Sequence, residues 1–144
     1  MKKTRRLLCL LLTVVLALSL CAIPAAAADD QTRSDDPVVF VHGLLGWGQR
    51  DRIYHIMPYW GMTTGSLTDY LSAKGYETYA ASVGPLSSAW DRACELYAQL
   101  AGTRTDYGVK HAQDFGHERY GIDYEQPLFD GWGTKRAVNL VGHS

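Results

Sequence analysis

The residues Val141-Gly142-His143-Ser144 have the types and the spacing of the first half of a Gly-x-Ser-x-Gly nucleophile elbow. In that turn a strand runs into a tight bend that lifts the serine hydroxyl above the sheet. The apolar run of residues 137–141 before it is typical of a short buried strand. The chemistry predicted for Ser144 is therefore nucleophilic attack on an acyl carbonyl. The alternative is a chance match, because Gly-His-Ser alone is a short string of common residues.

A second pattern lies far upstream, where residues 37–41 form another buried-strand pattern that runs into His42-Gly43-Leu44-Leu45-Gly46-Trp47-Gly48. A strand followed by His-Gly is the usual setting of an oxyanion loop, whose backbone N–H groups stabilise the negative charge formed in acyl transfer. The alternative is a glycine-rich surface turn. We name residues 42–48 the oxyanion loop because the two half-motifs occur in the order that a hydrolase requires.

From residue 37 to Ser144 the sequence resembles the secreted bacterial true lipases of the thermophilic Bacillus-relative and staphylococcal type, which are α/β-hydrolases. The resemblance rests on the oxyanion loop, on Tyr59-Trp60-Gly61, and above all on the block Val83-Gly84-Pro85-Leu86-Ser87-Ser88-Ala89-Trp90-Asp91-Arg92-Ala93-Cys94-Glu95 with its continuation to His111 and Gly116-His117. It implies an α/β fold, with residues 37–144 as the N-terminal part of an α/β-hydrolase domain. In that fold a mostly parallel sheet is flanked by helices.

The resemblance also implies a mechanism and a substrate. Ser144 is the expected nucleophile, and the backbone N–H of Leu44 is an expected oxyanion donor. The order nucleophile, acid, histidine places the other triad members after Ser144, so His42 and His143 are not the base. The expected substrates are triacylglycerols or related esters at an oil–water interface. Because the sequence stops at the elbow, we expect it to be an inactive, poorly stable fragment of an enzyme that also carries a lid and a calcium site.

Three residues match the zinc ligands of the family: Asp91, His111 and His117. Carboxylate and imidazole groups in a tetrahedral set suit Zn²⁺, and a fourth ligand is expected beyond Ser144. Two histidines six positions apart point about 240° apart on one continuous helix, so we predict that the helix ends at Gly116 and that the chain turns there. Without a metal, Asp91 is explained as a helix-start residue and the two histidines as solvated loop residues.

The N-terminus has the pattern of a secretory signal peptide over residues 1–28. Four basic residues precede an apolar stretch from Leu7 to Ile23, and an alanine tract follows. A retained membrane anchor is the alternative, although the apolar stretch is near the minimum spanning length. We therefore expect a secreted, extracellular protein without a stable membrane span. Its formal charge of −1 becomes more negative when the basic leader is removed. An acidic chain of this kind has no basic patch that would indicate nucleic-acid binding.

The remaining chain predicts the elements that position these groups. Residues 29–36 are polar and acidic and are predicted to be a flexible lead-in. A helix over residues 66–73, a strand over residues 76–82 and a helix from Ser88 to Gly102 give an alternating β/α order. The second helix is predicted to bury the face formed by Trp90, Ala93, Cys94, Tyr97 and Leu100. Cys94 is expected to be a small buried hydrophobe rather than a reactive thiol.

The segment 103–134 contains several aromatic residues and is too long for a simple αβ loop, and the resemblance assigns it to part of a small zinc subdomain. The aromatic residues Trp47, Tyr54, Tyr59 and Trp60 either border an acyl pocket or pack a loop, and we favour packing. Two other functions fit the sequence. One is a carboxylesterase or acyltransferase of the same fold, and the other is a secreted, non-catalytic zinc-binding module that ends at Ser144. The oligomeric state is not predicted.

Overall fold

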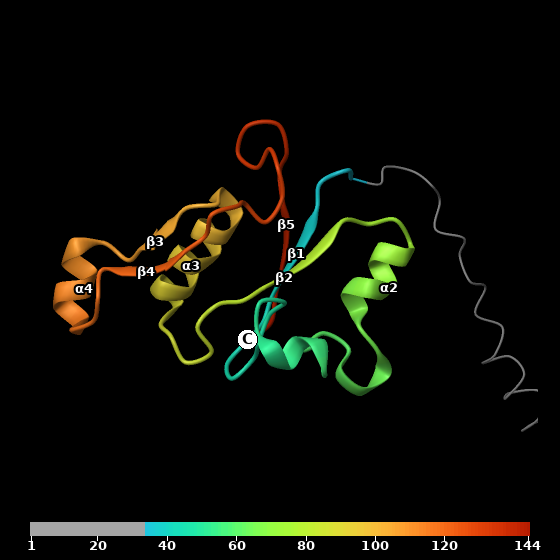
Figure 1. Ribbon diagram of the computed structural model, residues 1–144, viewed down its shortest axis with the longest axis horizontal. Helices are drawn as coiled ribbons and strands as arrows, with labels where there is room; N and C mark the ends of the chain where they lie inside the picture. Colours follow the sequence, from blue (N-terminus) through green and yellow to red (C-terminus); the bar gives the residue numbers. More distant parts are fainter. Residues whose placement is uncertain (1–33) are drawn as a thin grey trace, which may run out of the picture. The chain divides into compact units, whose positions relative to one another are not determined.

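The structure, a computed structural model, describes residues 34–144. The predicted signal peptide and most of the predicted lead-in lie outside these residues. The elements, in chain order, are β1 Val38–Val41, η1 Arg52–His55, η2 Met62–Thr64, α2 Leu67–Ala73, β2 Thr78–Ala81, α3 Ala89–Ala101, β3 Arg104–Asp106, α4 Val109–Phe115, β4 Tyr120–Asp123 and β5 Asn139–Gly142 (Figure 1). Each strand and helix that the sequence predicts is present.

Three strands form a parallel sheet in the order β2-β1-β5, with β1 in the centre. In the register, Val41 pairs with Ala81 on one side and with Gly142 on the other. The chain order therefore reverses at β1, and in parallel sheets ligands bind outside the carboxyl ends of the strands at such a switch point. The oxyanion loop and Ser144 follow the carboxyl ends of β1 and β5, so the topology places both half-motifs at this point.

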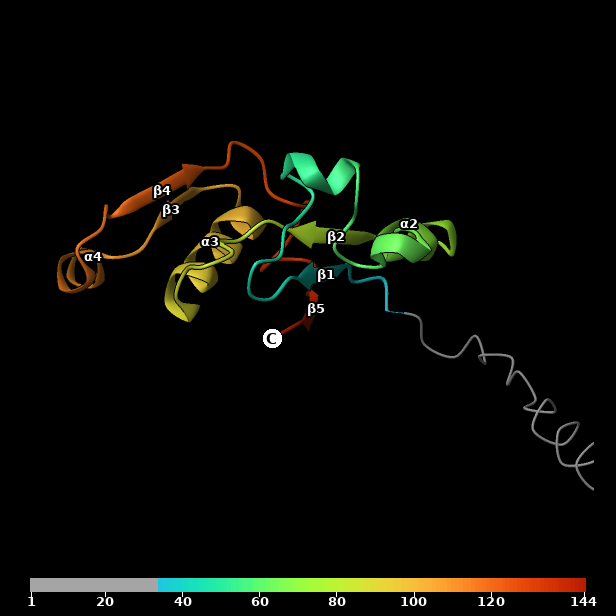
Figure 2. The same ribbon diagram turned by 90° about the horizontal axis from the view of Figure 1, so that it is seen from below.

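The helices α2 and α3 lie on opposite sides of the sheet (Figures 1 and 2). Each begins with a serine cap, because the Ser66 side chain accepts the backbone N–H of Asp69 and Ser88 accepts that of Asp91. α3 ends at Gly102 in the left-handed conformation, as the sequence predicts. The core on the α3 side consists of apolar residues from β1, from β2, from α3 and from the segment before β5: Val39, Ala81, Leu100 and Phe129.

The buried face of α3 differs from the prediction. Trp90 and Tyr97 are 56% and 60% exposed, and Ala93 is also exposed, whereas Leu100 is buried as predicted. The buried positions of the last turns are Ala98, Gln99 and Leu100. The 3.6-residue period identifies which residues share a helix face, but it does not identify the face that packs against the rest of the protein. On α3, polar side chains bind backbone groups of the loops that follow the sheet strands.

β3 and β4 form an antiparallel pair that the sequence does not predict, since both strands are short. In both views α3 lies between this pair and the three-stranded sheet (Figures 1 and 2). Arg119 joins the pair by two hydrogen bonds to Asp106, at 2.9 and 2.6 Å. β3, α4 and β4 thus lie in the segment 103–134, for which the small subdomain remains a prediction.

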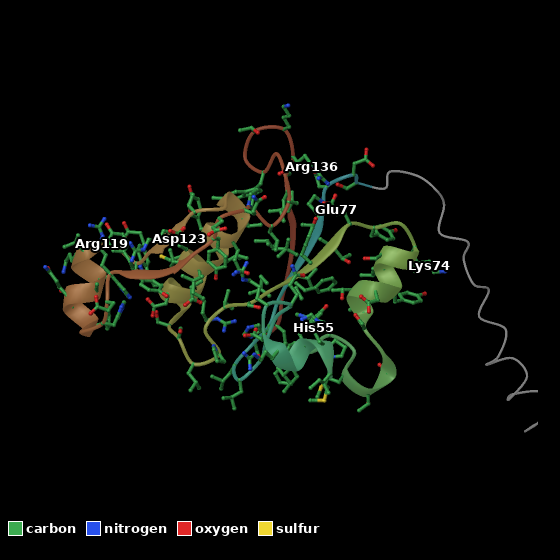
Figure 3. All side chains as sticks on the ribbon, viewed as in Figure 1. His55, Lys74, Glu77, Arg119, Asp123 and Arg136 are labelled. Atoms are coloured by element: carbon green, nitrogen blue, oxygen red, sulfur yellow. The ribbon has the colours of Figure 1, made fainter. Side chains whose placement is uncertain are left out.

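An ion pair connects the segments that enter the central sheet. Arg136, before β5, donates to Glu77, before β2, at 2.5 Å, and Figure 3 shows the two side chains pointing toward each other. Arg136 also binds the carbonyl of Asp35 at 2.9 Å. The guanidinium therefore links the entry points of all three parallel strands. His55, labelled on η1 in Figure 3, is exposed.

Candidate hydrolase site and metal centre

The oxyanion loop lies directly against the nucleophile elbow. The His143 N–H donates to the Val41 carbonyl at 3.0 Å, and the Leu44 N–H donates to the Ser144 carbonyl at 3.0 Å. A Cβ atom on Gly43 would lie 1.9 Å from the same Ser144 oxygen, so only glycine permits this approach. The structure therefore brings Leu44 and Ser144, which are far apart in the sequence, together.

The peptide group that presents the Leu44 N–H is held by its own carbonyl, that of Gly43. This oxygen lies 3.1 Å from the Gly46 N–H and 2.9 Å from Nδ1 of His42. Nε2 of His42 accepts the Val83 N–H at 3.3 Å, so the ring proton is on Nδ1 and is donated to Gly43. His42 is completely buried and both of its ring nitrogens are hydrogen-bonded.

Tyr59 connects the loop to the elbow. Its hydroxyl accepts the Gly43 N–H at 3.3 Å and lies 2.5 Å from Nδ1 of His143. The tautomer of His143 sets which partner donates in this second bond, and in either direction one oxygen connects the two segments. The rings of Trp47 and Trp60 contact Tyr59 edge-on, at centroid distances of 5.4 and 5.6 Å. These aromatic residues pack the loop, as favoured from the sequence.

The loop exposes apolar side chains beside this site. Leu44 and Leu45 are 69% and 65% exposed, and Leu45 has a φ of 56°, a left-handed conformation that is rare for a leucine. The Leu45 N–H donates to the Pro85 carbonyl at 2.9 Å, and Leu86 is 75% exposed. Strained backbone that presents apolar side chains is more typical of a functional site than of a packing element.

Asp91, His111 and His117, which we name the metal triad, are brought together by the β3–α4–β4 segment. Their candidate ligand atoms all lie within 4.8 Å of one another. Asp91 Oδ1 is 2.9 Å from His111 Nε2 and 3.7 Å from His117 Nε2. α4 ends at Gly116 with a φ of 69°, and the His117 N–H then folds back onto Ala112, which confirms the predicted turn.

The hydrogen bonds around the triad suit a cation. His117 Nδ1 lies 2.8 Å from the Glu118 carbonyl, so this nitrogen carries the proton and the Nε2 lone pair faces Asp91. The other Asp91 oxygen accepts the Ser88 hydroxyl at 2.8 Å, which fixes the carboxylate. Burial favours a higher pKa for Asp91, but hydrogen bonds from Ser88 and His111 and the electrostatic effect of the two imidazole rings outweigh it, and the net pKa is lowered. A carboxylate with two imidazoles is the donor chemistry of a zinc or similar divalent site.

Three residues of α3 contact the hydrolase loops and are not identified as functional in the sequence: Arg92, Glu95 and Gln99. Arg92 donates to the Gly84 carbonyl at 2.7 Å and to the His42 carbonyl. The Tyr107 hydroxyl donates to Glu95 at 2.9 Å, and burial followed by this bond raises the pKa of Tyr107. Their spacing could have identified them in the sequence, because it places three polar side chains on one face of the predicted helix.

Cys94 is partly buried rather than fully buried. Burial is the main cause of its raised pKa, and the carboxylates of Asp91, Asp106 and Glu95 add to it. The thiol is therefore protonated at neutral pH, in agreement with the prediction that it is not a reactive nucleophile. Within residues 34–144, no helix combines the length and the apolar character needed to cross a bilayer.

Comparison with known proteins gives consistent matches. A family described as "Lipase-like, C-terminal domain" matches residues 34–144. Lipase 1 of Staphylococcus aureus is 39% identical over 131 residues, which is 85% of this chain and 19% of that protein. The lipase structure from Staphylococcus hyicus superposes with a TM-score of 0.69 at 41% identity over 79% of this chain and 29% of that chain. A structure titled EstA from Clostridium botulinum gives a TM-score of 0.68 at 44% identity, over 78% and 26%.

The chain thus spans about a fifth of the length of the curated relatives it matches. Its small parallel sheet flanked by helices is part of the α/β-hydrolase type of fold found in the matched lipases, which confirms the predicted fold class at this level. The predicted resemblance to staphylococcal lipases is also confirmed.

Proposed function

The chain belongs to the lipase-like family matched by residues 34–144, and from this membership we propose that the protein hydrolyses carboxylic ester bonds of lipids with Ser144 as the nucleophile. The observation that carries the proposal is the 3.0 Å hydrogen bond from the Leu44 N–H to the backbone of Ser144. It supports an arrangement in which a backbone donor is already directed at the residue that would attack the ester.

In the proposed reaction the Ser144 hydroxyl oxygen attacks the ester carbonyl carbon, and a histidine takes the hydroxyl proton. The carbonyl oxygen becomes an oxyanion, and it replaces the Ser144 carbonyl as the acceptor of the Leu44 N–H. The N–H of the residue after Ser144 supplies the second donor. Collapse of the intermediate releases the alcohol, which takes the proton from the histidine, and water then hydrolyses the acyl-enzyme to the free acid.

The acid and the histidine of the triad are proposed to follow Ser144 in a longer gene product. The two histidines nearest to Ser144 support this, because His42 is engaged with Val83 and Gly43, and His143 with Tyr59. Residues 37–144 are then the first part of the hydrolase domain, and residues 29–144 expressed alone are expected to have no activity. The same proposal includes export directed by residues 1–28.

Triacylglycerols are the proposed substrate class. The exposed side chains of Leu44, Leu45 and Leu86 support this, since the oxyanion loop and the segment bonded to it present apolar surface that suits acyl chains rather than charged substrates. A short soluble ester has little apolar surface to bury there. We therefore expect higher rates on emulsified long-chain esters than on soluble esters, and the reverse result favours a carboxylesterase.

The test of the proposed function compares the complete wild-type gene product with Ser144→Ala, using triolein emulsion and a soluble p-nitrophenyl ester. Ser72→Ala is the matched control, because Ser72 is an exposed serine on α2. We expect a loss of at least ~10³-fold in kcat for Ser144→Ala and none for the control. A fluorophosphonate probe should label wild type and the control only. Hydrolysis that survives Ser144→Ala rejects the proposal.

We also propose that the metal triad holds a structural Zn²⁺, with a fourth ligand from a later part of the gene product. When bound, the ion would cross-link α3 to the α4 segment. The test is metal content and zinc affinity of the complete gene product and of Asp91→Asn. Asp114→Asn is the control, because Asp114 is a surface carboxylate on α4 that pairs with Lys110. Equal zinc content in Asp91→Asn and the control rejects the site.

A further inference from the structure

One polar face of α3 binds the backbone of the segment that follows β2. Gln99 is buried, and its side-chain amide donates to the Ser82 carbonyl at 2.8 Å and accepts the Ser82 N–H at 3.1 Å. One turn earlier, Glu95 accepts the Gly84 N–H at 2.5 Å. Backbone groups of residues 82–84 thus find partners on α3 rather than in the sheet.

Arg92 extends this face to the hydrolase site. One of its terminal nitrogens donates to the Gly84 carbonyl at 2.7 Å, and the other donates to the His42 carbonyl, where the oxyanion loop begins. Within residues 34–144, none of the ion pairs includes Arg92. A guanidinium that binds two carbonyls has the fixed fork geometry needed to hold two loops at one separation.

The oxyanion loop is tied to the same segment by independent contacts. The Val83 N–H binds the His42 ring, and the Leu45 N–H binds the Pro85 carbonyl at 2.9 Å. The Arg92 contact differs because it acts on the peptide group that precedes Gly43. Rotation of that peptide would move Gly43 and the donor N–H that follows it.

We propose that Arg92 is a positioning residue for ester hydrolysis: by clamping the His42 and Gly84 carbonyls it fixes the Leu44 N–H at the place where the oxyanion forms. This inference rests on the proposed function. Asp91, the residue before Arg92, belongs to the metal triad. Successive side chains on a helix point about 100° apart, so Asp91 and Arg92 are directed to different sides of α3. The first turn of α3 therefore connects the metal triad on one side with the oxyanion loop on the other.

The first test measures kcat and KM of the complete gene product for wild type, Arg92→Lys and Arg92→Ala. Arg104→Ala is the matched control, because Arg104 contacts the Tyr120 ring on the β3–β4 pair and lies outside the clamp. We expect kcat to fall roughly 10- to 100-fold in Arg92→Ala, with KM changed by less than about twofold. Arg92→Lys should recover only part of kcat, because an ammonium group lacks the fork.

Added guanidinium ion should restore kcat of Arg92→Ala severalfold at low millimolar concentration, whereas ammonium ion should not. A purely structural role would not give this selectivity. An unchanged kcat in Arg92→Ala, or an equal loss in Arg104→Ala, overturns the proposal.

The second test does not depend on activity. Hydrogen exchange of a peptide covering residues 42–48 should be faster in Arg92→Ala than in wild type and unchanged in Arg104→Ala. Arg92→Lys provides the same measurement if the alanine variant does not fold. If wild type hydrolyses no ester, the proposed function fails while the exchange result still stands. Unchanged exchange over residues 42–48 shows that Arg92 does not clamp the loop.

Discussion

Removing the Tyr59 hydroxyl should destabilise the protein and slow ester hydrolysis together. Tyr59→Phe retains the ring and its contacts with Trp47 and Trp60, but it removes the acceptor of the Gly43 N–H and the hydrogen-bond partner of His143 Nδ1. Gly43 is buried, so water does not readily replace the lost acceptor. The perturbation therefore isolates the hydrogen bonds that connect the oxyanion loop to the elbow.

The expected magnitude follows from the two bonds. An unsatisfied buried N–H costs about 1–3 kcal/mol, whereas the bond to the exposed His143 contributes less, because water can replace it. A total near 2 kcal/mol, with a urea dependence near 2 kcal/mol per molar, shifts the unfolding midpoint by roughly 1 M. The freed Gly43 peptide also relaxes the adjacent Leu44 N–H, so we expect kcat to fall about tenfold.

The assay is urea unfolding of the complete gene product, followed by tryptophan fluorescence, together with steady-state kinetics. Tyr70→Phe is the control, because the Tyr70 ring is 60% exposed on α2 and its hydroxyl is remote from the elbow. A surface change of this kind should alter the free energy of unfolding by less than about 0.5 kcal/mol. Equal midpoints and equal kcat for the two variants would refute the reasoning.

Three further predictions concern the loop, the subdomain and the metal triad. Gly43→Ala should lower kcat about 100-fold, because its Cβ would lie 1.9 Å from the Ser144 carbonyl and the loop must move away; wild-type kinetics would contradict this contact. The hydrogen bonds from Arg119 lower the pKa of Asp106 from 3.8 to about 2, so the Asp106 contribution to stability is present above pH 3.8 and is lost as the pH falls toward 2. Asp106→Asn should therefore be less stable than wild type at pH 7 but not at pH 2, and parallel unfolding curves at the two pH values would argue against it. Chelation should lower the thermal unfolding temperature of wild type, and added zinc should restore it, since a ligand at 100 times its Kd adds about 2.7 kcal/mol to the free energy of unfolding. The unfolding temperature of Asp91→Asn should respond to neither treatment. An unchanged wild-type transition would count against the metal triad.

Short-range signals in the sequence predicted much of the fold. Ser66 and Ser88 start helices because their side chains accept free N–H groups, and Gly102 and Gly116 end helices in the left-handed conformation. These effects act over one helical turn, so the sequence contains all the information that they require. The turn at Gly116 was predicted by the same reasoning, and it places the His111 and His117 rings 5.2 Å apart.

Other features depend on segments that are remote in the sequence. The burial of α3 was predicted wrongly at Trp90, Ala93 and Tyr97 and correctly at Leu100. Arg92 and Gln99 find backbone partners in loops that only the folded sheet places beside the helix. The β3–β4 pair was missed because its strands have only three and four residues, too few for an alternation to be recognised. The bond between Tyr59 and His143 joins residues 84 positions apart.

The sequence by itself determined the types of group that this protein offers: a serine in a Gly-x-Ser turn, a glycine-rich loop after a strand, and a carboxylate with two imidazoles. Those identities rest on local chemistry and on spacing. Only the tertiary structure decided that the Leu44 N–H faces Ser144, that both ring nitrogens of His42 are hydrogen-bonded, and that α3 contacts the oxyanion loop through Arg92 and carries Asp91 of the metal triad. The physical reason is that hydrogen-bond partners are selected by distance in space, and the parallel register of β1 with β5 sets that distance.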